Sequence, residues 1–177
     1  MKVVAFTGYS GAGKTTLIER VIALLRAAGQ RVAVAKHAHH GFDIDREGKD
    51  TWRHRQAGAA EIVIASSHRL VLMREYETPA ERTVHDLLAE LSDCHWALVE
   101  GFRRSELPKI EIWRAETGHE AHYPTDPHIV AVATDNVQHL PVPTTLPVLD
   151  INDAAAIVSF LNQNPARYEY HRPDRAR

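Results

Sequence analysis

Cysteine is almost missing from this sequence: Cys94 is the single one among 177 residues, so no disulfide forms within the chain. A lone thiol is typical of proteins in reducing compartments. The sequence also lacks a charged leader followed by an apolar stretch and a cleavage site. No apolar run approaches the ~20 residues that a membrane helix needs. We therefore expect a cytoplasmic protein with no membrane partner.

A strong excess of charge of one sign is also missing. The 21 lysine and arginine residues and the 23 aspartate and glutamate residues leave a formal net charge of −2 when the histidines are neutral. This balance gives no electrostatic reason to expect a nucleic-acid partner. The sequence has no internal repeat and no low-complexity segment, and its length fits one domain. We expect this domain to span residues 1–164 and the polar residues 165–177 to form a mobile tail.

A phosphate-binding loop is the clearest motif that the sequence does contain. Residues 8–15 read GYSGAGKT, which fits the pattern G-x-x-x-x-G-K-[ST]. The apolar, β-branched residues 2–7 before it predict a buried strand, and residues 16–28 after it predict an amphipathic helix that ends at Gly29. Strand, glycine-rich loop and helix follow one another in the order that the motif requires. The pattern therefore predicts a site for a nucleoside triphosphate.

The residue types of this loop suit that ligand. Gly11 and Gly13 lack a Cβ, so the backbone can curl until its N–H groups point inward. The amino end of the following helix adds free N–H groups and a positive dipole. We expect Lys14 to reach the β- and γ-phosphates and the hydroxyl of Thr15 to bind Mg²⁺.

The remaining pattern predicts an α/β fold of the P-loop NTPase class, with a mostly parallel twisted sheet flanked by helices. Residues 61–66 and 69–74 are joined by a very short turn and predict an antiparallel hairpin on the edge of this sheet. Residues 109–114 alternate charged and apolar side chains, as a half-exposed strand does. Other strands are expected at residues 31–36, 95–99, 128–134 and 148–151, and other helices at 51–59, 79–91 (capped by Thr78) and 154–161.

Two acids follow predicted strands at the edge of the sheet where ligands bind. Glu100 comes directly after the strand at 95–99 and is expected to approach Mg²⁺ or its water shell. Asp135 comes after the strand at 128–134, where guanine-specific proteins of this class carry an acid that binds the base. Because the full N-K-x-D motif is absent, a plain loop aspartate is an equally good interpretation of Asp135.

Three histidines and two aspartates crowd the segment after the second strand: His37, His39, His40, Asp43 and Asp45. One interpretation is a nucleotide-site loop in which Asp43 and Asp45 hold the magnesium shell or a water near the γ-phosphate. The others are a solvated loop and a dedicated transition-metal site, although the spacing fits no standard zinc pattern. No role is assigned to the histidines.

Several segments together resemble one family, the MobB proteins of molybdenum cofactor biosynthesis. The histidine–aspartate segment joined to Gly48-Lys49-Asp50 is the most specific of them. The similar segments are GYSGAGKTT (8–16), KHAHHGFDIDREGKD (36–50), WRHRQAGAA (52–60), LVEGF (98–102), PKIEIWR (108–114), IVAVATD (129–135) and LDIND (149–153).

The resemblance implies a homodimeric adapter that binds GTP with Mg²⁺ and hydrolyses it weakly. Its implied partners are the molybdenum cofactor guanylyltransferase and molybdopterin or its molybdenum form. By position, Thr15 and Glu100 would serve the metal, and Asp43 and Asp45 would lie in the loop that faces the γ-phosphate. Our own site hypothesis adds Asp43 to the metal ligands, Lys14 and Asp45 to catalysis, and Asp135 to the nucleotide-binding residues. The implied nucleotide-binding residues of the loop are Ser10, Gly11, Ala12, Gly13, Lys14, Thr15 and Thr16.

Two other functions remain open at this point. A small-molecule kinase would use the same loop, with Asp43 or Asp45 as its base, and Arg103 and Arg104 are the candidates for its lid arginines. A pure binding module would hold a pterin or a nucleotide without any chemistry.

Overall fold

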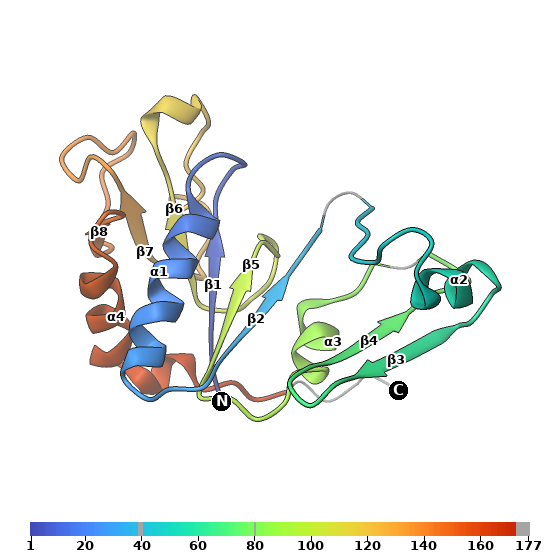
Figure 1. The fold of residues 1–177 in the computed structure, drawn as a ribbon. Coiled ribbons are helices and arrows are strands. Elements are labelled where there is room, and N and C mark those ends of the chain that lie inside the picture. Colours follow the sequence, from blue (N-terminus) through green and yellow to red (C-terminus); the bar gives the residue numbers. More distant parts are fainter. Residues whose placement is uncertain (39–40, 80, 173–177) are drawn as a thin grey trace. The chain divides into compact units, whose positions relative to one another are not determined.

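The computed structural model describes residues 1–38, 41–79 and 81–172 (Figure 1). The chain divides into two compact units, where the sequence predicted one domain. The first, which we call the sheet unit, comprises Met1–His37 and the chain from Thr83 onward. The second, the hairpin unit, is Ala38–Arg82. No helix in these described ranges is both long and apolar enough to cross a membrane.

The sheet unit contains the predicted parallel sheet. Within the described residues it has six strands in the order β2-β5-β1-β6-β7-β8, and every neighbouring pair is parallel. The strands are β1 (Lys2–Thr7), β2 (Val32–Lys36), β5 (Trp96–Glu100), β6 (Lys109–Ile112), β7 (Ile129–Thr134) and β8 (Val148–Asp150). Because β1 lies between β5 and β6, the residues that follow these three strands meet at one edge of the sheet.

Helices cover both faces of this sheet. On one face, α1 (Lys14–Ala27) and α4 (Ala154–Gln163) lie side by side (Figure 1) and bury apolar side chains against Val4 and Phe6 of β1. On the other face, α3 (Val84–Ala89) packs on Val3 and Ala5. Successive side chains of β1 therefore pack into two cores, one on each face of the sheet. This explains why the strand is a continuous apolar run in the sequence.

Strand β6 differs from the half-exposed strand that its alternation predicted. All four of its residues are buried, and Lys109 and Glu111 are each 1% exposed. Lys109 forms an ion pair with Asp126, with 2.7 Å between Nζ and Oδ2. Glu111 accepts hydrogen bonds from the backbone N–H groups of His122 and Tyr123. The charged side chains are buried because residues 122–126 supply their partners.

Helix α3 is shorter than predicted and begins later. Thr83, and not Thr78, is its N-cap: the Thr83 hydroxyl accepts from the N–H of Asp86, whose carboxylate accepts from the N–H of Thr83. This capping box satisfies two N–H groups reciprocally and fixes the start of the helix at Val84. Residue 80, inside the predicted helix, lies outside the described residues.

The chain after α4 is not the mobile tail that the sequence predicted from residue 165. Pro165–Tyr168 form a 3-10 turn, and the Tyr168 side chain is buried beside Trp96, with 5.4 Å between ring centroids. Tyr170 then contacts His85, with 2.8 Å between its hydroxyl and Nδ1. The segment is also held by backbone contacts with the start of β1, since the N–H of Tyr170 donates to the backbone oxygen of Met1 and Lys2 pairs with Glu169. Residues 173–177 lie outside the described residues.

The hairpin unit contains α2 (Asp50–Gln56), β3 (Glu61–Ala65) and β4 (Leu70–Arg74). The predicted antiparallel hairpin is confirmed, but it forms a two-stranded sheet of its own and is not an edge of the parallel sheet. Large apolar side chains of both strands are exposed, including Val63 at 62% and Leu70 at 67%.

Candidate functional site

The phosphate-binding loop connects β1 to α1 in the conformation that its glycines predict. Gly13 is the N-cap of α1 and has a φ of 94°, which L side chains rarely adopt. Gly8 has a φ of 137°, and a Cβ there would collide with the carbonyl oxygen of Ile112 on β6. Glycine is therefore required at both ends of the loop, once for the turn into the helix and once for close packing on the neighbouring strand.

Lys14 folds back over this loop. Its Nζ donates a hydrogen bond to the backbone oxygen of Tyr9, 2.7 Å away. Burial lowers the pKa of Lys14, whereas the negative charge of Glu100 acts in the opposite direction. The ammonium group is thus held at the loop by a neutral acceptor that a phosphate oxygen can replace.

Thr15 and Glu100 come together as the sequence predicted. The Thr15 hydroxyl donates to Oε1 of Glu100 over 2.8 Å, and Nζ of Lys36 lies 3.1 Å from the same oxygen. Glu100 is only 8% exposed and ends β5, the strand that pairs with β1. A hydroxyl and a carboxylate are the oxygen donors that Mg²⁺ prefers, so this pair beside the loop fits that ion.

Asp135 lies just beyond the end of β7 and is held in an ion pair. Its Oδ2 accepts from Nε of Arg114 over 2.8 Å, and Arg114 also contacts Glu116. The hydrogen bond to Asp135 is the main reason why the pKa of Arg114 is raised. A base that donates to Asp135 would either replace the Arg114 guanidinium or share the carboxylate with it.

Asp43 and Asp45 belong to the hairpin unit, and their contacts lie within it. Oδ2 of Asp43 lies 2.7 Å from Arg55, which holds the pKa of that carboxyl below its usual range. Oδ1 of Asp45 accepts from the Thr51 hydroxyl over 2.8 Å. The other Asp45 oxygen, Oδ2, is buried without a hydrogen-bond partner in the described structure. A single arginine therefore organises both aspartates.

A dedicated metal site finds no support in the described part of the chain. Among residues 1–38, 41–79 and 81–172, no three His, Cys, Asp or Glu side chains are grouped so that they could hold a metal ion. The ring of His37 lies 4.9 Å from that of Phe102. His39 and His40, which the sequence placed in the same segment, lie outside the described residues.

Four side chains form a group beside the loop: Tyr9, Arg103, His119 and His122. The sequence analysis gave no role to His119 or His122, and it considered Arg103 only as a lid arginine of the alternative kinase. The Tyr9 ring stacks on His119, with 3.9 Å between centroids, and lies 4.9 Å from His122. NH1 of Arg103 is 3.1 Å from Nε2 of His122. Burial, followed by the charge of Arg103, lowers the pKa of His122. One signal could have indicated this group. The chain segments after β5 and β6 begin at the same edge of the sheet as the loop, so their side chains could be expected near it.

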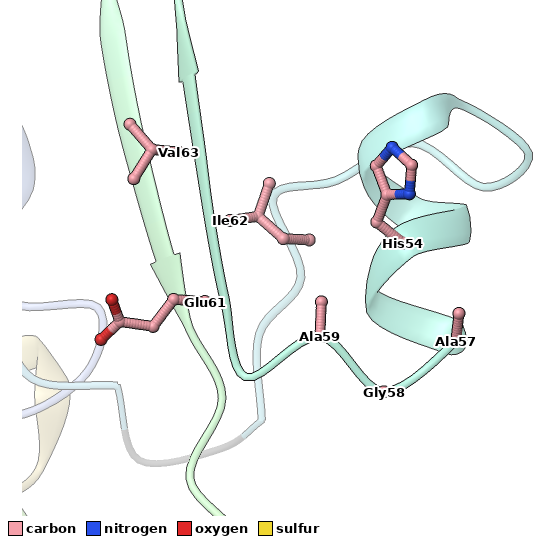
Figure 2. Close-up of a pocket in the computed structure, with 7 residues that line it drawn as sticks. All are labelled: His54, Ala57, Gly58, Ala59, Glu61, Ile62 and Val63. Atoms are coloured by element: carbon pink, nitrogen blue, oxygen red, sulfur yellow. The ribbon is translucent and has the colours of Figure 1, made fainter.

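An open depression of about 620 Å³ lies in the hairpin unit. None of the residues that line it was predicted as a site residue. Figure 2 shows Ile62 pointing toward α2, whereas the carboxylate of Glu61 points away from it. Its lining residues are His54, Ala57, Gly58, Ala59, Glu61, Ile62 and Val63. With so few polar groups converging on it, this depression does not have the donors that a phosphate chain needs.

Comparisons with known proteins identify one family over most of the chain. The profile described as "MobB: Molybdopterin guanine dinucleotide synthesis protein B" matches residues 3–135. The molybdopterin-guanine dinucleotide biosynthesis adapter protein of Escherichia coli (strain K12) is 38% identical over 162 residues, 90% of each chain. The protein of the same name from Haemophilus influenzae is 38% identical over 162 residues, 90% of this chain and 86% of that protein.

A solved structure supports the fold. The crystal structure of a MobB protein homolog from Bacillus stearothermophilus matches with a TM-score of 0.69 at 24% identity. The match covers 96% of this chain and 100% of that one. It therefore extends over both units and over the chain that follows α4.

Proposed function

Because this chain belongs to the MobB family, we propose that it is a GTP-binding adapter of molybdopterin-guanine dinucleotide biosynthesis, working in the cytoplasm. The names of its relatives in E. coli and H. influenzae support the adapter role. The observation that carries the nucleotide part is the 2.8 Å hydrogen bond between Thr15 and Glu100 beside the glycine loop. It supports the proposal because a hydroxyl and a carboxylate, oxygen donors of the kind that Mg²⁺ prefers, meet beside the glycine-rich loop.

In this proposal, residues 10–16 bind the phosphates through their N–H groups and the amino end of α1. Lys14 exchanges the Tyr9 carbonyl for oxygens of the β- and γ-phosphates. Asp135 serves the guanine base, with its carboxylate already oriented by Arg114. The same residues occupy one edge of the sheet, since they follow β1 and β7.

Mg²⁺ would be held by Thr15 and Glu100. When bound, the ion neutralises charge on the β- and γ-phosphates. On the resemblance alone, we also assign Asp43 to the metal and Asp45 to the attacking water. The two aspartates then depend on Arg55 for their orientation. We expect hydrolysis to be weak, because an adapter needs positioning more than turnover.

The adapter would act as a homodimer beside the guanylyltransferase that joins GMP to molybdopterin. Exposed apolar side chains of β3 and β4 offer a surface for such contacts. An interface of this kind works by excluding water from apolar area, so it requires no charged residue at its centre.

The test is competitive binding of GTP and ATP to the full chain, with and without Mg²⁺. We expect Lys14→Ala to lower the affinity for Mg·GTP about 100-fold or more, because charge-assisted hydrogen bonds to phosphate are lost. Lys49→Ala, which removes an exposed lysine ahead of α2, is the matched control and should bind as the unaltered chain does. Normal titration of Lys14→Ala would rule out the phosphate-loop assignment.

A further inference from the structure

We propose that Arg103 binds the terminal phosphate of the nucleoside triphosphate and that His122 holds its guanidinium ready for this contact. The inference rests on the proposed nucleotide site and adds a residue that neither the motif nor its spacing singles out. It follows from the way in which two buried charges on β6 organise the chain around Arg103.

The backbone before Arg103 takes an unusual path. Gly101 has a φ of 93° and Phe102 a φ of 51°, and Phe102 is the one non-glycine residue with a positive φ in the described structure. A bulky side chain in this region costs of order 1–3 kcal/mol and persists only where surrounding contacts enforce it. The turn carries the chain from Glu100, the candidate metal ligand, to Arg103 within three residues. Arg103 therefore follows the candidate metal ligand closely in sequence.

Lys109 holds the backbone at the end of this path, and Glu111 holds the backbone of His122. Nζ of Lys109 donates to the backbone oxygens of Arg103, at 2.9 Å, and Ser105, at 2.6 Å. Glu111, two positions further along β6, accepts from the N–H of His122 at 2.7 Å. One strand therefore fixes both the Arg103 backbone and the His122 backbone. Burying two charges is expensive and seldom improves stability over apolar packing, so their use here is to set geometry.

The guanidinium of Arg103 is hydrogen-bonded to a ring nitrogen of neutral His122. Burial and the nearby positive charge lower the pKa of His122, so its Nε2 accepts from NH1 of Arg103 at 3.1 Å. Within the described residues, no carboxylate pairs with Arg103. The side chain is exposed, and its other donors are available to an anion. A planar fork of donors without a counter-ion is suited to a phosphate group.

The same pair is connected to the phosphate loop. The His122 ring lies 4.9 Å from the ring of Tyr9, and the Tyr9 carbonyl accepts from Lys14. In loops of this pattern the lysine serves the β- and γ-phosphates. A chain of contacts through His122 and Tyr9 connects Arg103 to Lys14. In the sequence, Arg103 follows Glu100 by three positions. This placement favours the terminal phosphate over the base.

The experiment compares Mg·GTP and Mg·GDP binding to the full chain by calorimetric titration. We expect Arg103→Ala to weaken GTP binding about tenfold and to change GDP binding less than about twofold, since only GTP offers the terminal phosphate. Arg103→Lys, which keeps the charge, should restore part of the loss. Arg26→Ala removes an exposed arginine near the end of α1 and should leave both affinities unchanged.

Equal weakening of GTP and GDP, or no weakening of either, would overturn the assignment of Arg103. The Lys14→Ala variant separates this failure from failure of the proposed function. If Lys14→Ala loses nucleotide binding while Arg103→Ala keeps the GTP-to-GDP ratio, only the role of Arg103 is wrong. If the unaltered chain binds neither nucleotide, or Lys14→Ala binds normally, the nucleotide site itself is wrong and Arg103 has no ligand there.

Discussion

Glu100 receives one donor from helix α1 and one from strand β2, which makes it the residue on which the metal assignment depends. Its Oε1 accepts from Thr15 and lies beside Nζ of Lys36. Glu100→Gln would keep the shape of the side chain and remove its charge. We expect the Mg²⁺-dependent part of GTP binding to weaken about 10- to 100-fold, while binding measured without Mg²⁺ changes little.

Titration of GTP at several Mg²⁺ concentrations measures this effect. Glu106→Gln is the control, because Glu106 is an exposed glutamate on the same loop between β5 and β6. An equal loss with and without Mg²⁺ would mean that Glu100 supports the loop and does not bind the ion.

His122 gives the molecule a defined pH dependence. Its folded-state pKa is held below the ordinary 6.5 by burial first and by Arg103 second, while Asp126 and Glu120 act in the opposite direction. Between that lowered pKa and 6.5 the unfolded chain binds more protons than the folded chain. The contribution of His122 to the free energy of unfolding is therefore present above pH 6.5 and is lost as the pH falls through this window.

His122→Gln keeps an acceptor for Arg103 and removes the titration. We expect its free energy of unfolding to fall less steeply than that of the unaltered chain between pH 7 and pH 5. Urea denaturation across this range measures the slope, and His68→Gln, in the exposed turn between β3 and β4, serves as the control. Equal slopes for His122→Gln and the unaltered chain would show that folding does not lower the pKa of His122.

At the scale of elements, β6 is the strand whose stability depends most on charge. Lys109→Met leaves the Asp126 carboxylate and two backbone oxygens without their buried donor. Removing one member of a buried pair costs about 3–5 kcal/mol. Lys2→Met breaks the exposed pair with Glu169 and should cost less than about 1 kcal/mol.

Chemical denaturation of both variants compares the two pairs directly. Similar small losses would mean that the interior around β6 admits water. A large loss for Lys109→Met, together with weaker discrimination between GTP and GDP, would tie the strand to the Arg103–His122 contact.

The elements that the sequence predicted well are those with a local signal. The strand, loop and helix of residues 2–27 show clear hydrophobic periodicity and have glycines at their turns. Gly13 marks the start of the helix. The alternation of β6 was misleading because the partners of Lys109 and Glu111 come from residues 122–126. The start of α3 depended on a choice between two threonines, which only the reciprocal bonding of Asp86 decides.

At the candidate site, the motif predicted the meeting of Thr15 and Glu100, since both follow neighbouring parallel strands. The contact of Arg103 with His122 could not be predicted in this way. Neither residue belongs to a motif, and the two are brought together by side chains that a sequence pattern assigns to solvent. Contacts of this kind depend on burial, which is a property of the folded chain.

At the scale of the whole molecule, the sequence predicted the class of fold but not its division into two units. A hairpin pattern shows which strands pair with each other, but it contains no information on which sheet they join. The structure of the segment that follows α4 could not be predicted either, because it depends on long-range contacts of Tyr168 with Trp96 and of Glu169 and Tyr170 with the start of the chain.

The strand order has a consequence for the synthesis of this protein on the ribosome. β1 is made first, yet both of its neighbours, β5 and β6, begin only at Trp96 and Lys109. At about 5–20 residues per second, the apolar β1 waits roughly 5–20 seconds for its first partner strand. During this interval Val3, Val4 and Phe6 are open to unwanted association, so the yield of folded protein should rise when chaperones protect the nascent chain.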